Sequence, residues 1–339
     1  MRALSACAVA ASLDALGQPE QRVKKLGILN ALPREAPLPQ AILRGLRDLG
    51  YVEGRNLLVD YRSGPYDDFP ALAADLVNAK VDVIYAVLDQ AALAASKTTT
   101  TIPIVFAVLG DPVRAGLIAS LAHPGGNLTG LTAFSSELGG KRVELLKQLL
   151  PALGTIGVLW NPPLAAPDAR TNPAGLEKTA EAARAMDVEV RSLPVRRPTE
   201  IDAVLETATR ERLGGLIVEE DSITYAERDR IIRYAAAHRL PAIYGYRDYV
   251  ASGGLMSYGA RLPDLLHGLL EYIDRILKGA RPGDLPVRQP SSFELVINAE
   301  AARQAGLSIP QALLLRADEV IQWRIAGARR RRGSIEHSP

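Results

Sequence analysis

The sequence predicts an α/β protein made of two similar lobes, each built on a parallel sheet. Short apolar runs alternate with longer amphipathic segments from residue 23 onward, which is typical of strands and helices in turn. The same alternation starts again after residue 138, in similar order and spacing. Nearly continuous apolar strands separated by helices indicate a parallel sheet covered on both faces. Two such series in tandem therefore favour two similar lobes.

The first series predicts five strands and four helices. In its first helix the apolar residues Ile42, Leu43, Leu46 and Leu49 fall three and four positions apart, and Gly50 follows them. That spacing places the four side chains on one helix face, and glycine commonly ends helices. The expected strands are residues 25–30, 56–61, 81–87, 104–108 and 127–132, and the expected helices are residues 38–50, 69–80, 90–98 and 113–121.

The second series repeats this pattern before the alternation breaks down. Its expected helices are residues 138–150, 175–186, 201–212 and 225–238, and its expected strands are residues 155–160, 189–193, 215–218 and 241–244. The segments that follow do not fit a simple tandem arrangement, and several of them are extended. We expect them to run between the lobes and to act as a hinge beside an inter-lobe cleft. They are a strand at 253–259, a helix at 263–278, an extended stretch at 286–298, a short helix at 299–306 and a closing segment at 313–321.

Composition excludes several classes of protein. The chain has 339 residues, and its 40 basic and 38 acidic side chains leave a net charge of +2, so the charge gives no electrostatic case for nucleic-acid binding. No stretch approaches the roughly twenty apolar residues of a membrane span. The dense basic run 329–332 lies beyond the last hydrophobic pattern, so we expect residues 323–339 to form a solvated, disordered tail.

Metal and cofactor chemistry have no support in the sequence. Cys7 is the single cysteine, so neither an intrachain disulfide nor a thiolate metal site can form. The four histidines are scattered and none has a metal-ligand spacing. No dinucleotide fingerprint follows the first strand, and the sequence contains neither a phosphate-binding loop nor a nucleophile elbow. We therefore expect a binding protein with no cofactor and no catalytic residues.

The first 22 residues resemble the small, apolar core of a signal peptide that begins too late. A single Arg2 stands in place of a basic segment, and Asp14 interrupts the end. Residues 4–7 also match a bacterial lipoprotein cleavage box ending at Cys7, although the apolar segment before it is short. We interpret residues 1–22 as a leader and expect an upstream start. The alternative is a short disordered leader on a cytoplasmic protein.

Eight motifs, in order, make the chain similar to one known family. They are RGLRDLGYVEGRN (44–56), IPIVFAVLGDPV (102–113), HPGGNLTGLT (123–132), GKRVELLK (140–147), VLWNP (158–162), LPAIYGY (240–246), GGLMSYG (253–259) and FELVIN (293–298). Together they resemble the ABC transporter substrate-binding family that includes tryptophan- and tyrosine-uptake proteins. The resemblance covers about residues 23–321.

This resemblance implies the type I periplasmic binding-protein fold, with two Rossmann-like lobes joined by three crossovers. We expect the crossovers near residues 130–134, 254–259 and 285–289. One lobe would then comprise residues 23–131 and 258–285, and the other residues 132–257 and 286–322.

The implied function is capture of a small molecule in the cleft, an amino acid or a related and potentially aromatic compound. The expected partner is the membrane permease of an ABC transporter, with no nucleic acid involved. We expect a periplasmic monomer, lipid-anchored if Cys7 is acylated. The alternative is a ligand-sensing domain, because sugar-responsive repressors share this fold; too few residues precede the first strand here for their DNA-binding domain.

The strand-end rule gives candidate ligand-binding residues in the first lobe. Ligands of open parallel sheets sit beyond the carboxyl ends of the strands, which here are followed by Asn30, Asp89, Gln90 and Asp111. The helix start at Asp89 and Gln90 would suit an anion, but relatives have a small Gly-Thr or Gly-Ser pair there. Asp89 therefore favours a ligand with a donor or a cation, or else it caps the helix. For Asp111, followed by Pro112, helix capping is the preferred interpretation.

The second lobe offers Asn161 and an acidic run after the strand 215–218. Glu220 and Asp221 are the preferred partners for a ligand ammonium, because Glu219 follows directly on the apolar run. A solvated loop is the alternative for this run.

Four tyrosines crowd the segments near the hinge. A tyrosine supplies apolar area and a hydroxyl for gripping a ring or an aliphatic chain. We expect Tyr246 and Tyr258 in the cleft, and Tyr244 and Tyr249 in the core.

Overall fold

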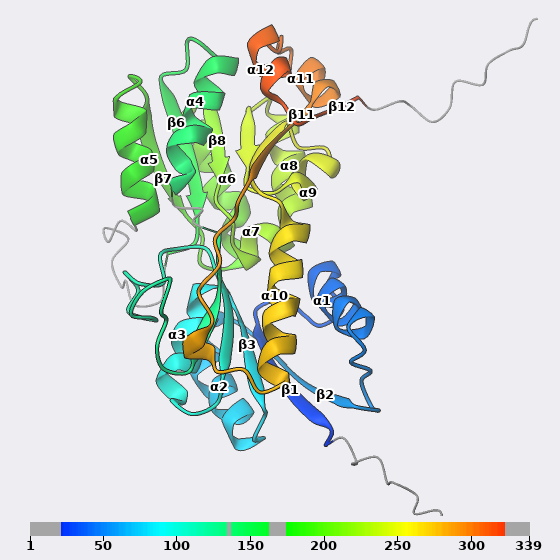
Figure 1. Cartoon of the computed structure of the whole chain (residues 1–339). Helices are drawn as coiled ribbons and strands as arrows, with labels where there is room; N and C mark the ends of the chain where they lie inside the picture. The colour runs from blue at the N-terminus through cyan, green and yellow to red at the C-terminus, as the bar shows by residue number, and fades with distance from the viewer. Residues whose placement is uncertain (1–21, 134–136, 163–173, 323–339) are drawn as a thin grey trace, which may run out of the picture.

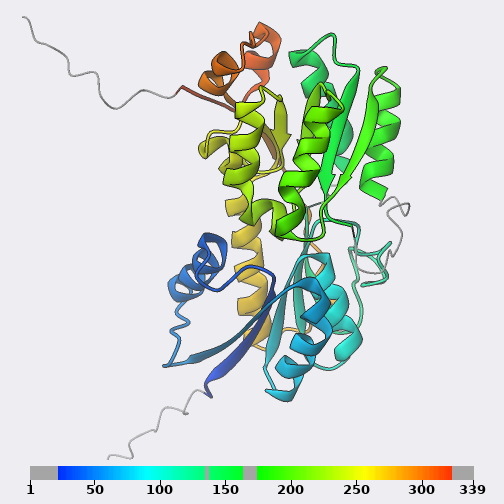
Figure 2. The same cartoon turned by 180° about the vertical axis from the view of Figure 1, so that it is seen from behind.

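The computed structural model describes residues 22–133, 137–162 and 174–322. Within these ranges the chain forms two lobes, one above the other in Figures 1 and 2, with connecting segments between them. The first described residues lie at the far end of one lobe and the last at the far end of the other. The expected leader, up to residue 21, and the expected basic tail lie outside the described residues.

The first lobe is built on a five-stranded parallel sheet in the order β2-β1-β3-β4-β5. Its strands are β1 (Lys24–Asn30), β2 (Leu57–Ser63), β3 (Val83–Val87), β4 (Ile104–Val108) and β5 (Leu128–Thr132). Its helices are α1 (Pro37–Asp48), α2 (Phe69–Asn78), α3 (Leu88–Thr98) and α10 (Leu262–Leu277). α10 returns from the other lobe and packs beside α1, as Figure 1 shows.

The second lobe is built on a seven-stranded sheet in the order β12-β11-β10-β9-β8-β6-β7, parallel except for the β10–β11 pair. Its strands are β6 (Thr155–Trp160), β7 (Glu189–Pro194), β8 (Gly215–Val218), β9 (Ala242–Tyr244), β10 (Met256–Ala260), β11 (Phe293–Asn298) and β12 (Glu319–Ile321). Its helices are α4 (Gly139–Leu149), α5 (Ala174–Arg184), α6 (Ile201–Arg210), α7 (Ser222–Ala226), α8 (Arg228–Ala237), α9 (Arg247–Ala251), α11 (Ala299–Gln304) and α12 (Gln311–Arg316).

Both faces of each sheet are covered by helices, which explains the almost unbroken apolar strands. In the first lobe α1 and α10 bury Leu46 and Ile273 against one face, and α2 and α3 cover the other. In the second lobe α4 buries Leu146 on one face, and α6 and α8 cover the opposite face with Leu205 and Ile231. A parallel sheet that is covered on both faces needs apolar side chains on both faces of its strands. The predicted two-lobed α/β fold is confirmed.

One predicted helix is wrong. Residues 113–121 form a series of turns in place of a helix. Gly116 adopts a φ of 70°, which is outside the range of a right-handed helix, so the single helical turn closed by the Ala115 N–H and Asp111 O is not continued.

Two of the expected lobe boundaries differ by a few residues from the strand pairing in the structure. β10 pairs with β11 up to Ala260, so residues 258–260 belong to the second sheet and not to the first lobe. Val287 donates its N–H to Leu121 O, and Arg288 exchanges backbone hydrogen bonds with Gly130 and Thr132. Residues 287–288 thus lie along β5, and the chain crosses to the second lobe after them. Backbone pairing, which hydrophobic patterning does not show, sets these boundaries.

Candidate ligand-binding site

The carboxyl ends of the strands in the two lobes face each other and are in contact. The Tyr66 hydroxyl, just after β2, donates to Asp221 Oδ2, just after β8, at 2.7 Å. One hydrophobic cluster is continuous across both lobes and includes Leu32 and Tyr66 from the first and Ile223 and Tyr225 from the second. Asp221, one of the strand-end residues predicted from the sequence, therefore lies at an inter-lobe contact.

Asn30 ends β1 with its side chain fully buried. Its Oδ1 accepts the Leu32 N–H at 3.1 Å, which fixes the amide plane. Its Nδ2 has no hydrogen-bond partner among the described residues. A buried amide without an acceptor is costly, so Asn30 carries an oriented and unused donor.

Asp89 holds two strand ends of the first lobe together. It lies in the first turn of α3 and accepts the N–H groups of Leu109 at 2.9 Å and Gly110 at 3.3 Å. Burial raises the pKa of Asp89, and these two backbone donors oppose that shift. The expected cap of α3 is wrong, because Val87 is the N-cap residue and Asp89 bonds to the loop after β4. Both its oxygens are occupied. Gln90 is half-buried beside it.

Asp111 caps a turn. Its Oδ1 accepts the N–H groups of Val113 at 2.9 Å and Arg114 at 3.2 Å, in an exposed setting. The capping interpretation fits this geometry, although the capped segment is a turn and not the predicted helix. No feature of the side chain favours Asp111 as a ligand contact.

A buried arginine that sequence reasoning missed organises the second lobe. The Arg142 side chain, from α4, is fully buried and forms a two-pronged ion pair with Glu220, one of whose contacts is 3.0 Å from Nη1 to Oε2. Its Nε donates to Tyr258 O at 3.0 Å. Glu220 lies against Gly245, where a Cβ would come within 2.1 Å of its carboxyl carbon. The sequence signal that could have identified it is the position of this arginine on the apolar face of the predicted helix 138–150.

Asp221 is also engaged by the protein itself. It caps α7 by accepting the Ile223 N–H at 2.8 Å, and its Oδ1 accepts Asn161 Nδ2 at 3.2 Å. With Tyr66 on Oδ2, both oxygens have donors. Burial raises the pKa of Asp221, although these hydrogen bonds oppose the shift. Asn161 therefore orients Asp221, and its contact with a ligand stays a prediction.

Glu219 is the acidic residue of this run that keeps a free oxygen. Its Oε2 lies 3.5 Å from Arg142 Nη1, and its Oε1 is buried without a partner among the described residues. Burial raises the pKa of Glu219 to about 7; Arg142 opposes this shift and Glu220 adds to it. Glu220 and Asp221 thus have protein partners on their carboxylates, whereas Glu219 Oε1 has none among the described residues.

The hinge-side tyrosines divide into two groups. Tyr246 is half-buried, 6.3 Å from Tyr225 edge to face, and burial and the nearby Glu220 raise its pKa. Tyr258 packs with Phe293, 6.1 Å between ring centres, on the α4 side of the sheet. Tyr258 is partly buried and packs against the second-lobe core, and its contact with a ligand stays a prediction. Tyr244 and Tyr249 stack at 4.7 Å and are buried, as predicted.

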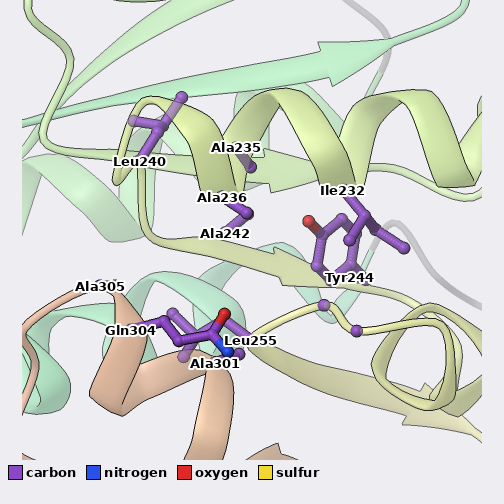
Figure 3. A pocket seen from close by; sticks show the side chains of 12 residues that line it. Ile232, Ala235, Ala236, Leu240, Ala242, Tyr244, Leu255, Ala301, Gln304 and Ala305 are labelled. Carbon is purple, nitrogen blue, oxygen red and sulfur yellow. The ribbon is translucent and has the colours of Figure 1, made fainter.

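A small cavity in the second lobe lies away from this contact. Figure 3 shows it between α8, β9 and α11, with Tyr244, Leu240 and Ala301 among its lining side chains. Its volume is about 50 Å³, little more than one water molecule, and solute pockets are typically several hundred Å³. It lies near the start of β10, where the strand-end rule places no ligand.

Metal and membrane features are not found among residues 22–133, 137–162 and 174–322. In these ranges no three His, Cys, Asp or Glu side chains gather as a metal site would require. No helix within them is both long and apolar enough to cross a bilayer.

The chain belongs to the ABC transporter substrate binding protein family, whose sequence profile matches residues 36–321. Its fold is that of the type I periplasmic binding proteins. Among curated proteins it is similar to a tyrosine-binding protein of Clostridioides difficile, with 27% identity, covering 84% of this chain and 81% of that protein.

Two solved structures are also similar over most of the chain. A conserved domain protein of Vibrio cholerae has 29% identity and a TM-score of 0.77, covering 88% of this chain and all of that one. An ABC domain from Streptococcus pneumoniae in complex with L-Trp has 25% identity and a TM-score of 0.74, covering 87% of this chain and all of that one.

Proposed function

We propose that this protein is the solute-binding component of an ABC importer and not an enzyme. It would capture a small molecule between its lobes by hinge closure and deliver it to a membrane permease. We place it in the periplasm as a monomer, free or held by a lipid on Cys7. Membership of a substrate-binding family supports this proposal.

The observation that carries the proposal is the pair of unused polar atoms at the facing strand ends. Asn30 Nδ2 in the first lobe is a buried donor, and Glu219 Oε1 in the second is a buried acceptor; neither has a partner among the described residues. Buried polar groups of native proteins are usually satisfied. A solute with an acceptor and a donor, bound between the lobes, would satisfy both.

The proposed solute is an amino acid with an aromatic side chain. Its carboxylate would accept from Asn30, its ammonium would donate to Glu219, and Tyr246 would supply apolar area beside the ring. The relatives named for tyrosine binding and for a complex with L-Trp support this class.

Thermal-shift measurements with the twenty amino acids test the proposal directly. A solute at 100 times its Kd stabilises the folded state by about 2.7 kcal/mol, so L-tyrosine or L-tryptophan should raise the melting temperature by several degrees. Solutes should be recovered chemically intact after long incubation. Conversion of the solute, or no shift with any amino acid, would refute the proposed function.

Calorimetry on variants tests the role of Glu219. Glu219→Ala should weaken binding of the best amino acid by about 2–5 kcal/mol, because an ammonium would be left unpaired in a closed site. Glu144→Ala, which removes a carboxylate from the outer face of α4, is the matched control and should bind like the parent. Equal affinities for both variants would exclude the ammonium contact.

A further inference from the structure

Tyr66 and Asp221 make a direct side-chain hydrogen bond between the lobes. The two residues are 155 positions apart, and only 7% and 8% of their surfaces are exposed. Tyr66 begins a short 3-10 turn after β2, and Asp221 caps α7 after β8. The bond thus joins the facing edges of two sheets that belong to separate lobes.

Each partner is held firmly by its own lobe. The Tyr66 ring packs edge to face on Phe69, with 5.2 Å between ring centres. Asp221 is oriented by the Ile223 N–H and by the Asn161 amide, both of which donate to its Oδ1. Its Oδ2 therefore points to Tyr66. Because neither side chain can follow the other without moving its lobe, the bond can form only when the lobes are together.

We propose that Tyr66 and Asp221 form an inter-lobe clasp that favours the closed arrangement before any solute is bound and slows solute release. The clasp deepens the proposed function, since its effect on release assumes that a solute binds between the lobes. Its effect on the lobes themselves needs no solute. Both residues are positioning residues, because they act through the arrangement of the lobes.

The expected size of the effect follows from the chemistry of the bond. A hydrogen bond from a hydroxyl to a buried carboxylate is stronger than one between neutral groups. Its loss leaves one carboxylate oxygen unsatisfied. Opening would let water satisfy that oxygen, so Tyr66→Phe shifts the balance toward the open form. The apparent Kd rises as the competent fraction falls, by about 10-fold for a bond of this kind.

Small-angle scattering of the solute-free protein tests the clasp. Tyr66→Phe should increase the radius of gyration relative to the parent. The matched control is Tyr51→Phe, since the Tyr51 hydroxyl donates to Asp274 Oδ1 at 2.9 Å within the first lobe. Both variants lose a tyrosine–aspartate bond, but only the first should open the protein. If Tyr66→Phe scatters like the parent, the clasp does not exist.

A second variant tests the clasp in case Tyr66→Phe does not fold. Asp221→Asn keeps the size of the side chain and removes the charge that strengthens the bond, so it should open the protein in the same direction. Cooperative thermal unfolding monitored by circular dichroism shows whether each variant is folded. Folded Asp221→Asn with parental scattering would count against the clasp even if Tyr66→Phe did not fold.

Stopped-flow release of L-tryptophan separates the clasp from the proposed function. For Tyr66→Phe, dissociation should be about 10-fold faster, and for Tyr51→Phe it should match the parent. If no variant binds L-tryptophan but Tyr66→Phe opens the solute-free protein, the clasp stands and the choice of solute fails. If all bind it with equal release rates and equal scattering, the clasp is refuted and the proposed function is not.

Discussion

The acidic residues at the strand ends of the two lobes have different roles. In the first lobe, Asp89 and Asp111 accept only backbone N–H groups of nearby loops. In the second lobe, Glu220 and Asp221 accept from side chains on distant elements, Arg142 and Tyr66. The first set shapes single turns, whereas the second joins helix to sheet and lobe to lobe. The same residue type at the same kind of position therefore supports either local or global structure.

The largest expected effect comes from breaking the buried ion pair of the second lobe. Arg142→Met leaves the Glu220 carboxylate buried without its counter-ion, and such changes cost about 3–5 kcal/mol of the free energy of unfolding. Urea denaturation measures this loss. The control is Arg230→Met, since Arg230 pairs with Asp202 on the surface, and it should leave the midpoint unchanged. Similar midpoints for the two variants would contradict a structural role for the pair.

A smaller effect is expected from the buried carboxylate of the first lobe. Asp89→Ala leaves the N–H groups of Leu109 and Gly110 without acceptors, at about 1–3 kcal/mol of the free energy of unfolding. Because these bonds are local, solution scattering should stay that of the parent. A variant that is destabilised and also open would show that the first-lobe carboxylate has a global role.

The third prediction concerns pH and Glu219. Its pKa is raised from 4.5 to about 7 in the folded protein, so both states hold the proton below about pH 4.5. Between about pH 4.5 and 7 the unfolded chain loses this proton while the folded protein keeps it, so the free energy of unfolding falls across this window. It levels off above about pH 7, where the folded protein also buries the charge. Relative to the parent, Glu219→Gln should be more stable by about 1–2 kcal/mol at pH 8 and nearly equal at pH 4.5.

Melting temperatures of parent and Glu219→Gln across this pH range provide the measurement. The variant keeps the Arg142–Glu220 pair, so the comparison isolates the second carboxylate. A difference that does not change with pH would show that Glu219 carries its charge throughout.

The smallest effect is expected at Asp111. Asp111→Ala removes the cap of an exposed turn and should change the free energy of unfolding by about 0.5 kcal/mol or less. Chemical denaturation of Asp111→Ala and Asp89→Ala compares the two carboxylates within one lobe. If Asp111→Ala lowers the free energy of unfolding as much as Asp89→Ala does, the difference in exposure does not explain the roles of these two carboxylates.

Much of the fold was predictable because it depends on local patterns. The strand at 215–218 has the predicted bounds, and each strand of the first lobe was found within a few residues. The helix expected at 113–121 failed at Gly116, whose backbone angle depends on the turn it occupies. Residues 258–260 and 287–288 lie on the other side of the expected lobe boundaries, because pairing with β11 and β5 decides where they lie.

The candidate site stays a prediction, and its details depend on tertiary contacts. Asn30, Glu219 and Tyr246 lie at or just after the ends of strands, and the Tyr66–Asp221 hydrogen bond shows that these ends of the two sheets are in contact. Alternation along a strand tells which residues share the face of Tyr258 but not what that face meets, which is Phe293 and the second-lobe core. Which carboxylate keeps a free oxygen depends on donors that are far away in the sequence.

By itself the sequence determined the alternation of strands and helices, the doubling into two lobes and the family to which the chain is similar. These features follow from periodicity and short motifs, which act over a few neighbouring residues. The tertiary structure alone decided that Arg142 pairs with Glu220, that Tyr66 donates a hydrogen bond to Asp221 and that Glu219 Oε1 has no partner among the described residues. Each of these outcomes depends on distances between residues about 75 or more positions apart, which the packing of the lobes sets and no local pattern encodes.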